Sequence, residues 1–240
     1  MSATATQPAP RTDAVPVANL RGASAGGRLP SGIVTFMFTD LEGSTRLLQA
    51  LGEIAYRAAL ERHYVVVREP IARNGGVEMG MIGDATFAAF ADPAAALRAC
   101  ADVQRALAAE AWPASARFAV RIGLHRGPAT PHHGTYVALA VHEAARIAAA
   151  AHGGQVVVSD AVRRATSPAS DGLRFVSLGE HMLKDFDDPV ALHQLAGHGL
   201  ERDFPILRTP RRRHPSLRLT SSALIGPEGG RAPIAASRYH

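Results

Sequence analysis

The 240-residue chain contains one cysteine, Cys100, and no apolar run approaching the roughly 20 residues that a membrane-spanning helix needs. A single cysteine excludes an internal disulfide and a cysteine-based structural zinc site. The first 20 residues lack the basic and continuous apolar regions of a secretory signal. We therefore expect a cytoplasmic protein that does not interact with membranes.

Lysine is almost absent as well, because Lys184 is the only one in the chain. The remaining basic charge is arginine, and it is unevenly placed. The formal charge is +2 over residues 1–32, −2 over 33–196 and +5 over 197–240. The arginine run at 211–213 has no interleaved aromatic residues, so it does not favour nucleic-acid binding.

Composition divides the chain into three parts. Residues 1–31 are rich in Ala, Pro, Ser, Thr and Gly and have no apolar period, which predicts a disordered N-terminal tail. Regular apolar patterns occupy residues 32–196 and predict one folded domain. Residues 197–240 then lose this pattern and predict a basic, mostly disordered C-terminal tail.

The patterns within 32–196 indicate an α+β fold. A buried strand (GIVTFMF) precedes a helix over 44–74, two strands around a Gly83-Asp84 turn, and a helix opened by Asp92-Pro93. The next elements are strands in FAVRIGLH and TYVAL, a helix in AVHEAARIAAAAH and a strand in QVVVS. A short helix at 160–166, a strand in LRFVSL and a hairpin around Lys184 follow. The βαββαβ order is that of a ferredoxin-like core with additional strands and helices.

Two aspartates stand where apolar strands meet turns. If Asp40 and Asp84 converge, their carboxylates could hold the divalent cations that accompany nucleotide phosphates. The helix start after Asp40 carries Gly43, Ser44 and Thr45, whose backbone N–H groups could face an anion. The alternative is that Asp40 caps the helix, Asp84 forms the turn, and the Ser/Thr pair is an ordinary cap.

Five blocks in order, FTDLEGSTRL, GGVEMGMIGDATFAAF, RIGLHRG, GTYVALAVHEAARIAAAAHGGQVVVS and LGEHMLKDF, resemble the class III adenylate/guanylate cyclase catalytic domain. The resemblance implies that Asp40, Asp84 and the carbonyl of Leu41 hold two Mg²⁺ or Mn²⁺ ions per site. It also implies a head-to-tail homodimer with its sites at the interface.

The same resemblance assigns roles to residues later in the chain. Arg146 falls on the arginine that stabilises charge on the transferring phosphate, a role suited to a guanidinium fork. Lys184 falls on the lysine that binds the terminal phosphates. His142 replaces the transition-state asparagine. Gly80 and Thr135 replace the pair that selects the base.

The resemblance therefore implies conversion of ATP, or less favourably GTP, to a 3′,5′-cyclic nucleotide and pyrophosphate in intracellular signalling. The replacements at Gly80 and His142 leave an alternative, a weakly active or inactive domain that binds nucleotide or regulates a partner. The C-terminal tail resembles the linker to an ATPase module in large transcriptional regulators, which implies a regulatory partner acting through that tail.

Overall fold

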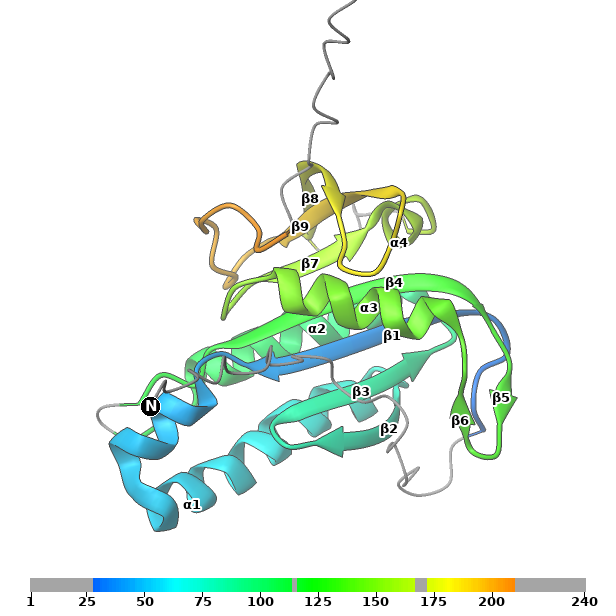
Figure 1. Ribbon diagram of the computed structural model, residues 1–240. Helices are drawn as coiled ribbons and strands as arrows, with labels where there is room; N and C mark the ends of the chain where they lie inside the picture. Colours follow the sequence, from blue (N-terminus) through cyan, green and yellow to red (C-terminus); the bar gives the residue numbers. More distant parts are fainter. Residues whose placement is uncertain (1–27, 114–115, 167–171, 210–240) are drawn as a thin grey trace, which may run out of the picture.

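The computed structural model describes residues 28–113, 116–166 and 172–209 (Figure 1). Its largest sheet has the strand order β2-β3-β1-β4-β7-β9-β8. These strands are β1 (Gly32–Leu41), β2 (Val77–Ile82), β3 (Ala85–Phe90), β4 (Val120–Ala129), β7 (Val156–Ser159), β8 (Arg174–Met182) and β9 (Pro189–Ala196). The helices are α1 (Ser44–Arg73), α2 (Pro93–Ala109), α3 (Leu139–Ala150) and α4 (Asp160–Arg164).

The strands β2-β3-β1-β4 with α1 and α2 form the ferredoxin-like core that the sequence predicts. β1 lies antiparallel between β3 and β4, and β7 joins β4 in parallel through α3. Helices α1 and α2 cover one face of the sheet and α3 covers the other (Figure 1). Because both faces of β1 are covered, its residues form a continuous apolar run rather than an alternating one.

Local signals account for several element boundaries. The side chain of Asp92 accepts hydrogen bonds from the N–H groups of Ala94 and Ala95 at 2.9 and 3.2 Å, and Pro93 opens α2 as predicted. Helix α1 is kinked at Gly52, whose φ of 74° is non-helical. This kink was not predicted, and it redirects the first two turns of α1.

Two predicted strands differ from the structure. The strand expected in TYVAL is limited to β6 (Thr135–Tyr136), which pairs only with β5 (Pro131–His132). Beyond it, Val137 and Leu139 are 80% and 76% exposed, and Leu139 already begins α3. β8 runs to Met182 rather than Leu178, because a register shift after Ser177 lets it continue pairing with β9.

The ends of the predicted domain also extend further. Residues 197–209 pack on the domain through buried Leu200 and Leu207. At the other end, the Pro30 carbonyl accepts a 2.6 Å hydrogen bond from the Tyr136 hydroxyl. The remaining parts of the two expected tails, residues 1–27 and 210–240, lie outside the described residues. Within the described part of the chain, no helix is both long enough and apolar enough to span a membrane.

Candidate active site

Asp40 and Asp84 converge at one end of the sheet. β1 pairs with β3 in the register Thr39↔Thr86, and the Thr86 N–H donates to the Thr39 hydroxyl at 3.1 Å. This register brings the turn before β3 beside the end of β1. Burial raises the pKa of Asp84, and the negative charge of Asp40 raises it further. The two carboxyl groups therefore share one electrostatic environment.

The carboxyl of Asp84 is incompletely satisfied. Ser44 and the backbone of Leu41 face it and lower its pKa, in opposition to burial and Asp40. Its Oδ2 atom, however, is buried and has no hydrogen-bond partner. A buried anionic oxygen without a partner is costly unless a cation or proton compensates it. This arrangement fits a hard divalent cation.

The loop after Asp40 exposes a helix start next to these carboxyl groups. Gly43 is the N-cap residue of α1, with a φ of 72° that favours glycine, and no side chain caps the helix. Ser44 faces Asp84 instead, so the ordinary Ser/Thr cap is wrong. The first N–H groups of the helix, at Ser44 and Thr45, have no intrahelical acceptor by position and carry the positive end of the helix dipole.

Arg121 is a site residue that sequence reasoning missed. It lies opposite Asp40 across the β1–β4 ladder, and its Nε donates to Asp40 Oδ2 at 2.6 Å. Its Nη1 also donates to the Ala149 carbonyl at the end of α3, at 3.1 Å. The sequence signal is a single arginine in the strand RIGLH, and only the register shows that it meets Asp40.

A second missed group supports the Gly83-Asp84 turn from α1. The Tyr64 hydroxyl donates to the Gly83 carbonyl at 2.7 Å. His63 is completely buried beside it, and burial lowers its pKa to about 4 while the backbone of Asp84 acts to raise it. In the sequence these residues are simply part of the predicted helix over 44–74. The Tyr64 hydrogen bond holds the turn in place against α1.

Arg146 and Lys184 form a separate group. Arg146 lies on α3 with a 22% exposed side chain and makes an ion pair with Asp185 in the β8–β9 connection. Lys184, the neighbour of Asp185, is exposed. His142 is exposed one helical turn before Arg146, on the same side of α3. The structure thus brings the predicted phosphate-facing residues to one surface.

The other two predicted residues lie in different sheets. Gly80 is buried in β2, opposite Phe87, where the β2–β3 register shifts. Thr135 lies in β6, half-buried, and its hydroxyl oxygen has no hydrogen-bond partner. Among the described residues, no hydrogen bond or ion pair joins the two aspartates, Asp40 and Asp84, to Arg146, His142 or Lys184. The predicted site residues of the described chain thus fall into groups that are not directly bonded to one another.

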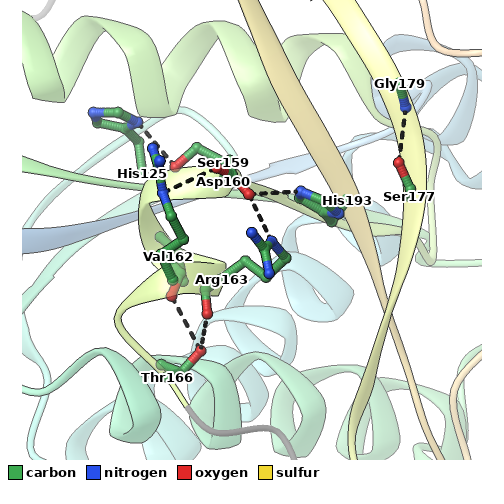
Figure 2. A network of polar contacts seen from close by, with 10 residues as sticks. His125, Ser159, Asp160, Val162, Arg163, Thr166, Ser177, Gly179 and His193 are labelled. Carbon is green, nitrogen blue, oxygen red and sulfur yellow. Dashed lines mark hydrogen bonds and ion pairs between the residues drawn. The ribbon is translucent and has the colours of Figure 1, made fainter.

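Figure 2 shows a polar network that stabilises the fold outside the candidate site. His125 Nδ1 lies 3.0 Å from the Ser159 hydroxyl and 3.2 Å from Glu143 Oε1, and burial lowers its pKa to about 4. Asp160 contacts His193 Nε2 at 3.1 Å and Arg163 Nε at 2.6 Å. The network links β4, β7, β9 and α4.

Within the described residues, no group of three or more His, Cys, Asp or Glu side chains is placed to hold a metal.

Residues 29–197 match the family described as the adenylate and guanylate cyclase catalytic domain. The chain belongs to this family. An adenylate cyclase structure from Trypanosoma brucei, described as in its monomeric state, is 26% identical. It matches with a TM-score of 0.68 over 77% of this chain and 95% of that one. The adenylate/guanylate cyclase/hydrolase of Silicibacter pomeroyi is 28% identical, with a TM-score of 0.59 over 69% and 97%.

Sequence relatives of this cyclase domain are more diverse in length. An uncharacterized protein of Mycobacterium tuberculosis is 34% identical over 185 residues, which are 75% of this chain and 61% of that protein. An adenylate cyclase of Lachancea kluyveri is 31% identical over 155 residues, 54% of this chain and 8% of that protein. The chain thus spans about three fifths of the mycobacterial relative and a small part of the yeast one.

Proposed function

We propose that this cyclase domain is a homodimeric nucleotidyl cyclase that converts ATP, or less favourably GTP, to a 3′,5′-cyclic nucleotide and pyrophosphate. The observation that carries the proposal is the convergence of Asp40 and Asp84, with Asp84 Oδ2 buried and unpartnered. In the reaction, the ribose 3′-oxygen bonds to the α-phosphorus and the bond to the β-phosphate oxygen breaks. The hydroxyl proton goes to solvent.

Asp40, Asp84 and the Leu41 carbonyl would hold two Mg²⁺ or Mn²⁺ ions, the kind of cation that this family uses. Such ions lower the pKa of the attacking hydroxyl and neutralise the leaving pyrophosphate. The N–H groups of the α1 start, at Gly43, Ser44 and Thr45, would bind phosphate oxygens. Arg121, whose Nε donates to Asp40 Oδ2, would offer its remaining N–H groups to the same phosphates.

The second half of the site would come from the other protomer. Arg146 and His142 share one side of α3, and Lys184 lies in the β8–β9 connection that contacts it. Placed across a two-fold interface, Arg146 and His142 would stabilise the charge on the transferring phosphate, and Lys184 would bind the terminal phosphates. The lack of a direct hydrogen bond or ion pair between Asp40 and Arg146 in the described part of the chain supports this arrangement.

Gly80 and Thr135, at the positions that select the nucleotide base, offer few contacts to distinguish adenine from guanine. Gly80 offers no side chain, and Thr135 offers one hydroxyl for a single hydrogen bond. The adenylate cyclase name of the Lachancea kluyveri relative supports ATP as the preferred substrate. We also propose a cytoplasmic location and a regulatory partner that acts through the C-terminal tail, residues 197–240.

A second candidate function is a nucleotide-binding regulatory domain with little turnover. Two ion pairs favour it, because Asp40 is held by Arg121 and Arg146 is held by Asp185. Both pairs must open before these residues can act on substrate. This domain would bind nucleotide and yield little or no cyclic product.

The deciding experiment measures cyclic-nucleotide formation by the purified protein with ATP and with GTP, in Mn²⁺ and in Mg²⁺. Asp40→Ala should abolish product formation. Asp203→Asn, an exposed aspartate in the C-terminal segment, serves as the control and should leave activity unchanged. Wild-type turnover in Asp40→Ala would refute the metal assignment. Nucleotide binding without product in the wild type would favour the regulatory domain.

A further inference from the structure

Residues 197–209 form an ordered segment that follows β9 and, apart from Gly197, lies beyond the part of the chain matched by the family. We call this segment the clasp. Leu207 is buried against Ile147, Leu183 and Leu192. The Arg208 N–H donates to the Ala150 carbonyl at 2.9 Å, and the Thr209 hydroxyl lies 2.9 Å from His181 Nδ1. The clasp is therefore docked on α3 and β8 near its end.

The clasp reaches the loop that carries the proposed metal ligands. The Arg208 guanidinium makes an ion pair with Glu42, the residue directly after Leu41. Glu42 is fastened from the other side by the Gly153 N–H, which donates to Oε2 at 2.6 Å. Burial acts to raise the pKa of Glu42, but the hydrogen bonds from Arg208 and Gly153 prevail and lower it.

A second connection runs from the clasp to Arg121. Arg121 bonds Asp40 and also the Ala149 carbonyl, and the next carbonyl, that of Ala150, accepts the N–H of Arg208. The end of α3 thus holds Arg121 through one carbonyl and the clasp through the next. Glu42, which follows Asp40 in the chain, and Arg121, which bonds Asp40, are therefore both held close to the docked clasp.

We propose that the clasp positions the end of β1 and the loop after it, which carry the proposed metal ligands Asp40 and Leu41. Arg208 is the positioning residue and Leu207 anchors it. The inference rests on the proposed function insofar as Asp40, Leu41 and Asp84 bind metal.

Positioning and simple electrostatics predict opposite results for Arg208. Loss of a positive charge near two carboxylates should tighten cation binding if charge alone matters. Loss of a positioning contact should weaken it. For Arg208→Ala in the full chain, we expect Mn²⁺ binding, measured by electron paramagnetic resonance of the free ion, to be about three- to tenfold weaker. Arg208→Lys, which keeps the charge, should recover part of the loss.

Leu207→Ala tests the clasp without changing any charge. It should weaken Mn²⁺ binding in the same direction and accelerate backbone hydrogen exchange over residues 40–46, measured by mass spectrometry without metal. The matched control is Ile206→Ala, the same kind of truncation at the preceding position, whose side chain is 84% exposed. It should change neither quantity. Thermal denaturation of each variant confirms that the domain is folded at the assay temperature.

The outcomes separate this inference from the proposed function. The positioning role of the clasp would be overturned by unchanged or tighter Mn²⁺ binding in Arg208→Ala. It would also be overturned by unchanged hydrogen exchange over residues 40–46 in Leu207→Ala. A wild-type protein that binds Mn²⁺ but forms no cyclic nucleotide would overturn the enzyme and leave the clasp standing. If the wild type binds no Mn²⁺, the metal site fails, and the clasp as a device for metal binding fails with it.

Discussion

Asp84→Asn should make the metal-free protein more stable. The Asp84 carboxyl is half-buried, lies in the field of Asp40, and has one oxygen without a partner. A buried polar group left unsatisfied costs about 1–3 kcal/mol. Asparagine removes the like-charge repulsion and places a donor near Asp40, although it weakens the contacts with Ser44 and Leu41. We expect a net gain of about 1 kcal/mol, or a Tm rise of about 2–4 °C for a domain of this size.

Divalent metal should reverse this order of stability. A ligand that binds only the folded state stabilises it by about 2.7 kcal/mol at a concentration 100 times its Kd. The wild type should gain this amount from Mn²⁺, whereas the asparagine variant lacks one of the two carboxylates. The variant should therefore melt above the wild type in a chelator and below it in saturating Mn²⁺. It should also lose about 100-fold or more of any cyclase activity.

The stability advantage of Asp84→Asn should also depend on pH. Because the folded-state pKa of Asp84 is raised, its neutral form is favoured by folding. The wild type has this stability below the unfolded pKa of about 4 and loses it as pH rises through the folded pKa. The advantage of the variant should thus appear at neutral pH and shrink in acid. Differential scanning calorimetry in chelator measures the Tm of the variant and of the wild type at neutral and at acid pH, with Asp203→Asn as the control. A variant that melts below the wild type in chelator at pH 7 would refute the reasoning.

Three further predictions follow from the same geometry. Arg146→Lys should lower kcat by about 100-fold, because a point charge replaces the fork, while Mn²⁺ affinity stays at the wild-type value; steady-state kinetics and metal titration check this. Mixing Asp40→Ala with Arg146→Ala protein should recover about a quarter of wild-type activity, since half of the dimers then carry one intact site; no recovery argues against shared sites. His125→Gln should flatten the acid dependence of stability. The depressed pKa of His125, about 4, means that its contribution is present above pH 6.5 and is lost as pH falls toward 4, and urea titrations at pH 7 and 5 measure it.

Much of the fold and part of the candidate site followed from local signals in the sequence. The apolar run after Gly32, the Asp92-Pro93 helix start and the Gly83-Asp84 turn are short-range patterns, and the structure has each of them. Asp40 and Asp84 could be paired in advance because both follow strands of one predicted sheet. The TYVAL strand failed because a strand also needs a partner, which no local pattern supplies.

Contacts between distant parts of the chain were decided only by the tertiary structure. Arg121 meets Asp40 because β1 and β4 pair in one register, and a shift of one residue would turn its side chain to the other face. His63 lies under the Asp84 turn only because α1 packs there. Arg208 pairs with Glu42, 166 residues earlier in the chain. Arg208 lies after residue 196, where the sequence has no apolar periodicity that would predict a packed segment. The sequence by itself determined which residues could do the chemistry, since residue type and local pattern are short-range properties. The packing of helices and the register of strands decided what holds those residues in place.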